Sequence, residues 1–243
     1  MNTLIIPDWP APANVQACST TRWGGASKAP WDSLNLGSHV GDNLADVENN
    51  RETLIALAGL PSMPVWMEQV HGTDVLRLND SLPESVRADA AWTRQSGVVC
   101  AAMTADCLPV LFCSDDGTQV AAAHAGWRGL CAGVLEATIR NFDCPVSSIH
   151  AWLGPAIGPN AFEVGVDVYD AFVAKDAQAA LAFRAAGDKY YADIWQLARQ
   201  RLEAIGVHSV SGGGLCTVSQ PDNFFSWRRD GVTGRLASLV WLI

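Results

Sequence analysis

Basic residues are scarce in this chain of 243 residues, where 16 lysines and arginines stand against 25 aspartates and glutamates and give a net charge of −9. Proteins that bind nucleic acids usually present a basic face, so this balance argues against a nucleic-acid partner. No apolar run approaches the ~18 residues that a membrane span requires, and the N-terminal segment has no basic region of the kind that opens a signal peptide. We therefore expect a soluble, cytoplasmic protein without a membrane partner.

Cysteine pairing motifs are also missing. The 7 cysteines are odd in number, form no CxxC, and match no disulfide framework, a pattern typical of reduced thiols in the cytosol. A chain of this length buries roughly 70% of its unfolded surface and needs no such cross-links. Because no repeat, low-complexity tract or linker interrupts the sequence, we expect one domain over residues 1–243.

Short apolar runs and helical periodicities are mixed along the chain. Runs typical of strands lie at 4–6, 15–20, 65–70, 98–103, 108–113, 120–124, 149–153 and 236–243. Helical periodicity lies at 47–58, 130–142, 168–186 and 194–205. Several consecutive strands are too close together for a helical crossover. The pattern therefore predicts an α+β fold with mixed or antiparallel sheets.

The sequence TADCLPVLFCSDDGTQVAAAHAGWRG predicts a hairpin between strands 108–113 and 120–124. If the two aspartates of the turn are its central residues, Cys107 faces His124. If the centre shifts toward the glycine, His124 faces Pro109 instead, and the sequence leaves both registers open. Side chains directly opposite each other begin ~4.5–5.5 Å apart. That separation suits two ligands of one metal ion or a thiol–imidazole pair.

A metal site in this region would need one more ligand, because catalytic zinc typically has three protein ligands and one open position. His71 ends an apolar run and precedes a glycine, much as His124 ends its strand before Ala-Gly, so it is the first candidate. His39 is the second. Asp106 places a carboxylate beside the thiol of Cys107. Since free cysteines are often buried as small hydrophobes, spacing alone leaves the metal site and ordinary packing both open.

Seven motifs spread over nearly the whole chain resemble the YfiH family, which is also called the laccase-domain or peptidoglycan-editing-factor family. They are TRWGGAS, SLNLG, EQVHG, MTADCLPVLF, HAGWRG, WLGPAIGP and FFSWRRDGVTGR. The resemblance implies mixed β-sheets flanked by helices, in a fold related to the catalytic domain of cytotoxic necrotizing factor. It also implies a metal site formed by His71, Cys107 and His124, with zinc as the usual ion and copper (Cu²⁺) as the alternative.

Three activities are associated with this family. The first is phosphorolysis of adenosine, inosine and methylthioadenosine to the free base and ribose 1-phosphate or its methylthio analogue, together with adenosine deamination. The second is a cysteine hydrolase that edits peptidoglycan precursors, with Cys107 as nucleophile and His124 as base. The third is polyphenol oxidation, but multicopper oxidases rely on paired HxH motifs, and the 5 histidines of this chain form none. One copper in a His₂Cys site stays compatible with weak oxidase activity.

We favour the purine nucleoside enzyme, because a His₂Cys zinc with an open position lowers the pKa of bound water toward neutrality. The hydrolase is the second interpretation, since it leaves His71 without a role. A metal-binding protein without activity is a more distant one. The expected partners are small molecules, purine nucleosides and phosphate, and we expect a monomer.

Phosphorolysis requires an anion site, and the arginines of the resembling motifs are its candidates. They are Arg22, Arg128, Arg228 and Arg229. The helix expected after His124 would add backbone donors. Asp106 is the candidate general base, or else the residue that orients His71 or His124. Asn35 and Gln69 are candidates for hydrogen bonds to the base or ribose.

Overall fold

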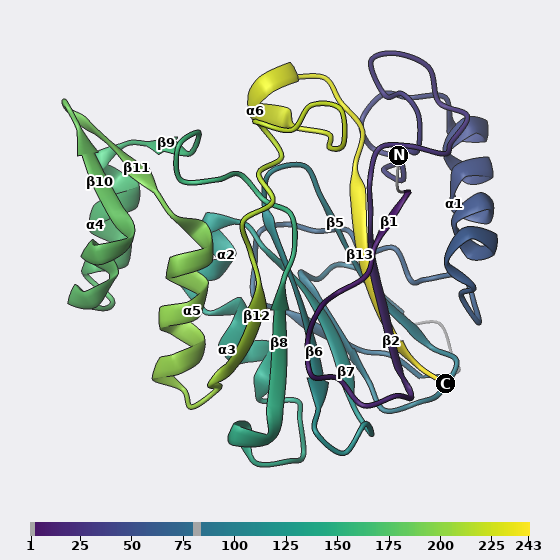
Figure 1. The fold of residues 1–243 in the computed structure, drawn as a ribbon, viewed down its shortest axis with the longest axis horizontal. Helices are drawn as coiled ribbons and strands as arrows, with labels where there is room; N and C mark the ends of the chain where they lie inside the picture. The colour runs from purple at the N-terminus through teal and green to yellow at the C-terminus, as the bar shows by residue number, and fades with distance from the viewer. Residues whose placement is uncertain (1–2, 80–83) are drawn as a thin grey trace.

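Two β-sheets packed face to face form the centre of the fold (Figure 1). The computed structural model describes residues 3–79 and 84–243, and none of the helices in this part has the length and apolar character needed to cross a membrane. The larger sheet has the order β12-β8-β6-β7-β4-β3, with bounds Ser209–Gly212, Ile149–Leu153, Leu108–Ser114, Val120–Ala125, Ala90–Thr93 and Val75–Arg77. The smaller has the order β1-β2-β13-β5, with bounds Leu4–Ile5, Val15–Thr20, Leu236–Leu242 and Val99–Thr104. The β12–β8 and β3–β4 pairs are parallel and the others in these two sheets are antiparallel.

Helices cover the outer face of each sheet. Helix α1 (Leu44–Ala58) packs on the smaller sheet. Three helices pack on the larger sheet, namely α2 (Trp127–Ala132), α3 (Val134–Ile139) and α5 (Ile194–Ala204). The layers therefore run helix, sheet, sheet, helix, which confirms the predicted α+β class with mixed sheets.

A third, antiparallel sheet extends beyond the larger one at the left of Figure 1. Its order is β10-β11-β9, with bounds Phe183–Ala186, Lys189–Ala192 and Glu163–Val164. Helix α4 (Val166–Val173) and the 3-10 helix η2 (Ala177–Ala182) pack beside it. The remaining short helices are η1 (Val146–Ser148) and α6 (Trp227–Asp230).

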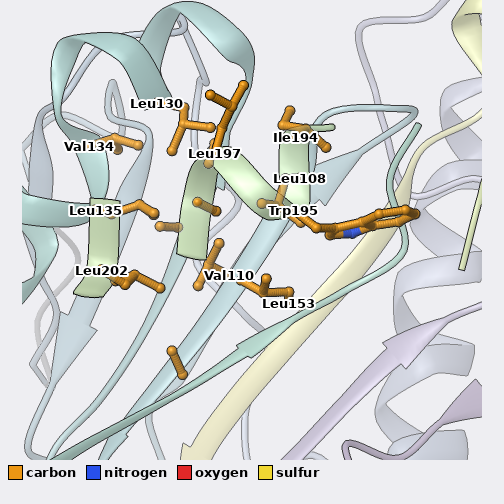
Figure 2. Packing of buried hydrophobic residues seen from close by; sticks show 14 of the residues in the cluster. Leu108, Val110, Leu130, Val134, Leu135, Leu153, Ile194, Trp195, Leu197 and Leu202 are labelled. Atoms are coloured by element: carbon orange, nitrogen blue, oxygen red, sulfur yellow. The ribbon is translucent and has the colours of Figure 1, made fainter. Parts of the chain in front are cut away.

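Alternation along the central strands fills two separate cores. In β6, Val110 and Phe112 point toward the helices, whereas Leu111 points toward the smaller sheet. Figure 2 shows the helical side, where leucines of α2, α3 and α5 meet Val110 and its neighbours. On β7, His124 has the parity of Ala122, which belongs to the core between the sheets. Because side chains alternate with a period of two, His124 points toward the end of the space between the sheets.

Three predicted elements differ in the structure. The predicted strand 65–70 forms only an isolated bridge between Glu68 and Arg87. The predicted helix 130–142 begins earlier and is divided at Gly133, whose φ of +109° places it in the left-handed region that ends helices. The predicted helix 168–186 ends at Val173, because its alanine-rich second half forms η2 and then pairs as β10 with β11.

Candidate metal centre

The β6–β7 hairpin takes the second of the two registers that the sequence left open. Pro109 pairs with His124, so the alternative in which Cys107 lies directly opposite His124 is wrong. The reason lies in the turn, where Gly117 has φ +66° and lengthens the connection beyond a two-residue loop. Cys107 instead lies one residue before β6, where the chain turns out of β5.

Asp106 holds that turn in place. Its φ of +91° is a conformation that residues with a side chain rarely adopt. The carboxylate accepts hydrogen bonds from the Thr217 hydroxyl and from the backbone N–H of Arg228, both at 2.6 Å. The bonds described for this carboxylate go to Thr217 and Arg228, whereas the carboxylate bonded to His124 is that of Asp89. These bonds fix the turn that precedes Cys107, and the predicted roles of Asp106 as a general base or as an orienting residue stay predictions.

His71 directly follows the segment 65–70 that was predicted as a strand. The side chain of Gln69 explains why no strand forms, because its amide donates to the Met103 carbonyl at 2.7 Å and accepts from the Met103 N–H at 2.8 Å. A side chain therefore takes the place of a backbone neighbour on β5. His71 follows with φ +60°. These bonds leave the second N–H and a second lone pair of the amide, and Gln69 lines the cavity, so its contact with a base or ribose stays a prediction.

Asp89, just before β4, orients the histidines and was not among the residues singled out from the sequence. It is fully buried, and its Oδ1 lies 2.8 Å from Nδ1 of His124. The same carboxylate accepts the backbone N–H groups of Val70, His71 and Gly72 at 3.1, 2.9 and 2.7 Å. One carboxylate thus fixes both the ring of His124 and the backbone that carries His71.

The three predicted ligands meet at one point. The ligand atoms of His71, Cys107 and His124 all lie within 4.8 Å of one another, and the Cys107 sulfur is 3.8 Å from Nε2 of His71. The imidazole rings meet edge to face at 79°. Gly126 makes room for this cluster, because a Cβ there would lie 2.6 Å from His71 and 3.0 Å from the Cys107 sulfur. The donor set of two imidazoles and a thiol is one that zinc and copper accept.

Without a metal, Cys107 and His124 shift each other's pKa in opposite directions. Burial by itself raises the pKa of the Cys107 thiol, but the adjacent His124 and His71 lower it to about 6. Burial likewise lowers the pKa of His124, but the Cys107 thiolate and Asp89 together raise it to about 9. The metal-free cluster therefore contains a thiolate beside an imidazolium at neutral pH.

A cavity of about 1000 Å³ opens at the cluster. All three predicted ligands line it, as do Asp106, Gln69, Arg128 and Arg228. Its wall is completed by the segment before α4 and by the exposed Trp227 of α6. Drug-sized ligands occupy pockets of ~300–1,000 Å³, so this cavity has space for a nucleoside and an anion together.

Comparisons with known proteins identify the family of the chain. The family model described as multi-copper polyphenol oxidoreductase laccase matches residues 16–243. The chain belongs to this family. The curated protein named purine nucleoside phosphorylase YfiH from Escherichia coli (strain K12) is 60% identical over 243 residues, which cover 100% of both chains. The family resemblance inferred from the motifs is thereby confirmed.

Other relatives of this chain are similar to it over nearly its whole length. The purine nucleoside phosphorylase PA4543 of Pseudomonas aeruginosa is 56% identical, over 100% of this chain and 99% of its own. The crystal structure of Neisseria meningitidis protein NMB0706 has a TM-score of 0.95 at 51% identity, covering 99% of each chain. That of YlmD from Geobacillus stearothermophilus has a TM-score of 0.90 at 34% identity, covering 96% of this chain and 94% of its own.

Three of the predicted substrate contacts of this family member lie outside the cavity lining. Arg22 forms an ion pair with Asp32 at 3.2 Å, and Arg229 pairs with its neighbour Asp230 at 2.7 Å. Asn35 is fully buried, and its side-chain amide forms hydrogen bonds with the backbone of Gly37 in the loop that follows it. All three are used in holding loops, which the motif resemblance alone did not separate from ligand binding.

Two arginines and a histidine that were not predicted as substrate contacts line the cavity instead, namely Arg51, Arg235 and His39. His39 was considered only as a metal ligand, and the two arginines were not considered. Arg235 ends the FFSWRRDGVTGR motif, which was a usable signal. Arg51 lies inside a helix whose pattern gives no sign that one face borders a cavity. Asp89, a lone carboxylate in the apolar run ADAAW, was also a usable signal, because a buried carboxylate needs a partner.

Proposed function

We propose that this protein is a zinc-dependent purine nucleoside phosphorylase that acts on adenosine, inosine and methylthioadenosine and also deaminates adenosine. The observation that carries the proposal is the cluster of His71, Cys107 and His124 on the wall of a cavity of about 1000 Å³. The printed names of relatives up to 60% identical over the full chain support it.

In this proposal His71, Cys107 and His124 hold the zinc ion, and the cavity leaves a position open to substrate. The fit rests on Asp89, because its bond to Nδ1 of His124 leaves Nε2 free to act as a ligand. When bound, zinc would supply Lewis acidity toward a water molecule or a substrate oxygen. Copper suits the same donors. A multicopper cluster is disfavoured, because the described residues contain no second group of three or more potential ligands.

The two proposed reactions, phosphorolysis and deamination, require different groups of the protein. Phosphorolysis forms a bond from a phosphate oxygen to C1′ of the ribose and breaks the bond from C1′ to N9, so negative charge passes to the base until it is protonated. Cationic residues such as Arg128, Arg228 and Arg235 on the cavity wall favour the approach of phosphate. Deamination replaces the amino group on C6 with oxygen from water and releases ammonia. Asp106 is the proposed group for proton transfer.

A thiol hydrolase is the second candidate, and a specific observation favours it. Cys107, His124 and Asp89 form a nucleophile, base and orienting carboxylate, and the pKa of Cys107 is lowered to about 6 mainly by His124, against the effect of burial. Such a group could act on peptidoglycan precursors. The arrangement gives no role to His71, which the metal interpretation uses.

Product analysis separates these candidates. Purified protein with measured metal content is incubated with adenosine, with and without phosphate. We expect ribose 1-phosphate only when phosphate is present, and inosine in its absence. If neither product forms at high protein concentration, the nucleoside proposal is wrong.

The metal assignment has its own test. His71→Ala should lose bound zinc, and full retention of zinc would exclude His71 as a ligand. For the hydrolase, metal-stripped protein is alkylated at Cys107 and then given zinc. Nucleoside activity that returns after alkylation would show that the Cys107 thiolate is dispensable, whereas hydrolase activity lost with alkylation and unaffected by zinc would favour the second candidate.

A further inference from the structure

A cationic cluster occupies the part of the cavity wall formed by the loop before α1. The loop residue Leu36 receives two hydrogen bonds on its carbonyl from Arg51 of α1, from Nε at 3.0 Å and Nη2 at 2.8 Å. The next residue, Gly37, packs so closely on the stem of Arg235 that a Cβ there would lie 2.7 Å from Cγ. The same built Cβ would lie 3.5 Å from the ring of His39. One short loop therefore gathers His39, Arg51 and Arg235.

This cluster lies beside the candidate metal centre. Arg235 directly precedes β13, whose first residue Leu236 pairs with Thr104 at the end of β5. The chain then turns through Asp106 to Cys107. The charges of both groups act on Arg235 and favour its protonated form, although burial lowers its pKa overall. Arg235 thus lies in the loop cluster and is close enough to Cys107 for the charge of the thiolate to act on it.

The positive charge of this cluster has no ion-pair partner among the described residues. The side-chain hydrogen bonds of Arg51 and Arg235 go to backbone carbonyls. Glu48 acts on Arg51 electrostatically but forms no ion pair with it. Burial and the nearby charges of Arg235 and Arg51 lower the pKa of His39, so the two guanidiniums carry the positive charge and the neutral imidazole can offer one N–H donor. Two partly buried guanidiniums on one cavity wall, without a carboxylate bound to them, form an environment that favours an anion.

The other cationic residues of the cavity are less suited to this role. Arg128 is exposed and stacks on Trp127, with its guanidinium carbon 4.3 Å from the ring centre. Arg228 is also exposed and donates to the carbonyl of Glu163 at 3.0 Å. The carboxylates of Glu163 and Asp167 belong to residues that line this same wall. Glu68 also lines the cavity, but neither Arg51 nor Arg235 forms an ion pair with it.

From these contacts we infer that His39, Arg51 and Arg235 form the binding site for inorganic phosphate, the co-substrate of the proposed phosphorolysis. The inference rests on that proposed function. Asn35 is then a positioning residue rather than a substrate contact. Its side chain donates to Gly37 O at 3.2 Å and accepts from the N–H groups of Gly37 and Arg235 at 3.0 and 2.9 Å, which ties the loop to Arg235.

The test uses conservative variants of the zinc-loaded protein. Arg51→Lys and Arg235→Lys keep the charge but lose the planar fork that binds a phosphate through two hydrogen bonds. His39→Asn changes an exposed side chain and disturbs the fold least. For each arginine variant we expect the KM for phosphate to rise about tenfold or more, with kcat at saturating phosphate and KM for the nucleoside changed much less. Arg77→Lys, on the outer strand β3 and outside the cavity lining, is the matched control and should match the wild type.

Direct binding keeps the inference separate from the proposed activity. Phosphate alone is titrated into each zinc-loaded protein by calorimetry, without nucleoside. Binding to the wild type that weakens about tenfold or more in Arg51→Lys and Arg235→Lys would support the site even if no phosphorolysis is found. Normal turnover with an unchanged phosphate KM in both variants would overturn the site while leaving the proposed function intact. A phosphate defect that appears in Arg128→Lys and Arg228→Lys instead, or binding of adenosine monophosphate but not of phosphate, would also overturn it.

Discussion

Replacing Asp89 with asparagine tests whether one buried carboxylate holds the candidate metal centre together. Oδ1 of Asp89 serves the His71 N–H and Nδ1 of His124, and Oδ2 serves the N–H groups of Val70 and Gly72. Asparagine is nearly the same size but turns one acceptor oxygen into an NH₂ donor. Whichever oxygen is replaced, a pair of donors on one side of the group then loses its acceptor.

The size of the effect follows from these contacts. A hydrogen bond to a charged group contributes about 1.5–3 kcal/mol, so losing two at a buried position should cost about 3–6 kcal/mol of unfolding free energy before any relaxation. Burial alone would raise the pKa of Asp89, but its bonds to His124 and the backbone N–H groups lower it overall. A carboxylate with a lowered folded pKa stabilises the protein above its unfolded pKa and loses that contribution as pH falls through the folded value. The difference between wild type and variant should therefore shrink in acid.

Two measurements are needed, because stability and metal affinity are separate consequences. Urea unfolding of the chelator-treated proteins gives the first. Competition with a zinc indicator gives the second, for which we expect about 10–100-fold weaker binding. Asp115→Asn is the matched control, since Asp115 is 71% exposed and bonds to His150, away from the cluster. If Asp89→Asn is as stable as wild type without metal and binds zinc equally well, Asp89 does not organise this centre.

Two further substitutions and one pH dependence test the same structure. Gly126→Ala should weaken zinc binding strongly, because the new Cβ would lie 2.6 Å from His71; wild-type affinity in a zinc titration would contradict this. In metal-free protein the alkylation rate of Cys107, followed by mass spectrometry, should level off above about pH 6, since the pKa of its thiol is lowered to about 6 by the histidines despite burial; a rate still rising at about pH 8, as for an ordinary thiol, would refute the thiolate. Leu135→Ala removes a fully buried side chain of α3 and should cost about 2–5 kcal/mol in urea unfolding, while zinc affinity stays unchanged; a parallel loss of zinc would show that the core and the centre are coupled.

The sequence predicted the parts of the fold whose pattern is local. Strands such as 15–20 and 149–153 have the predicted bounds, because a turn at Asn14 precedes the first and Gly154 follows the second. The segment 65–70 is apolar enough for a strand but is held by the side chain of Gln69. Propensity reports how a residue fits a pleated surface and contains no information about a side chain that replaces a backbone partner.

The candidate site was also predicted only in part. His71, Cys107 and His124 were named from motif resemblance, and the hairpin alone offered only a pair. Turn arithmetic between two registers could not decide the geometry, since the conformation of Gly117 sets it. Asp89 and Arg51 were not predicted, because their partners are distant in the sequence. Asp89 and His124 are 35 residues apart, and Arg51 and Leu36 are 15 residues apart.

The three candidate ligands are each held by bonds that need no metal, and this bears on how the two proposed activities can be separated. Asp89 orients His124 and the backbone of His71, and Asp106 fixes the turn before Cys107 through Thr217 and Arg228. Small zinc-dependent domains unfold without their ion because the metal supplies the folding energy. This centre lies instead at the edge of a core between two sheets, so the metal-free protein should keep its fold. Chelation then removes the ion without removing the thiol–imidazole pair, and activity that survives chelation can be assigned to Cys107 as a nucleophile rather than as a ligand.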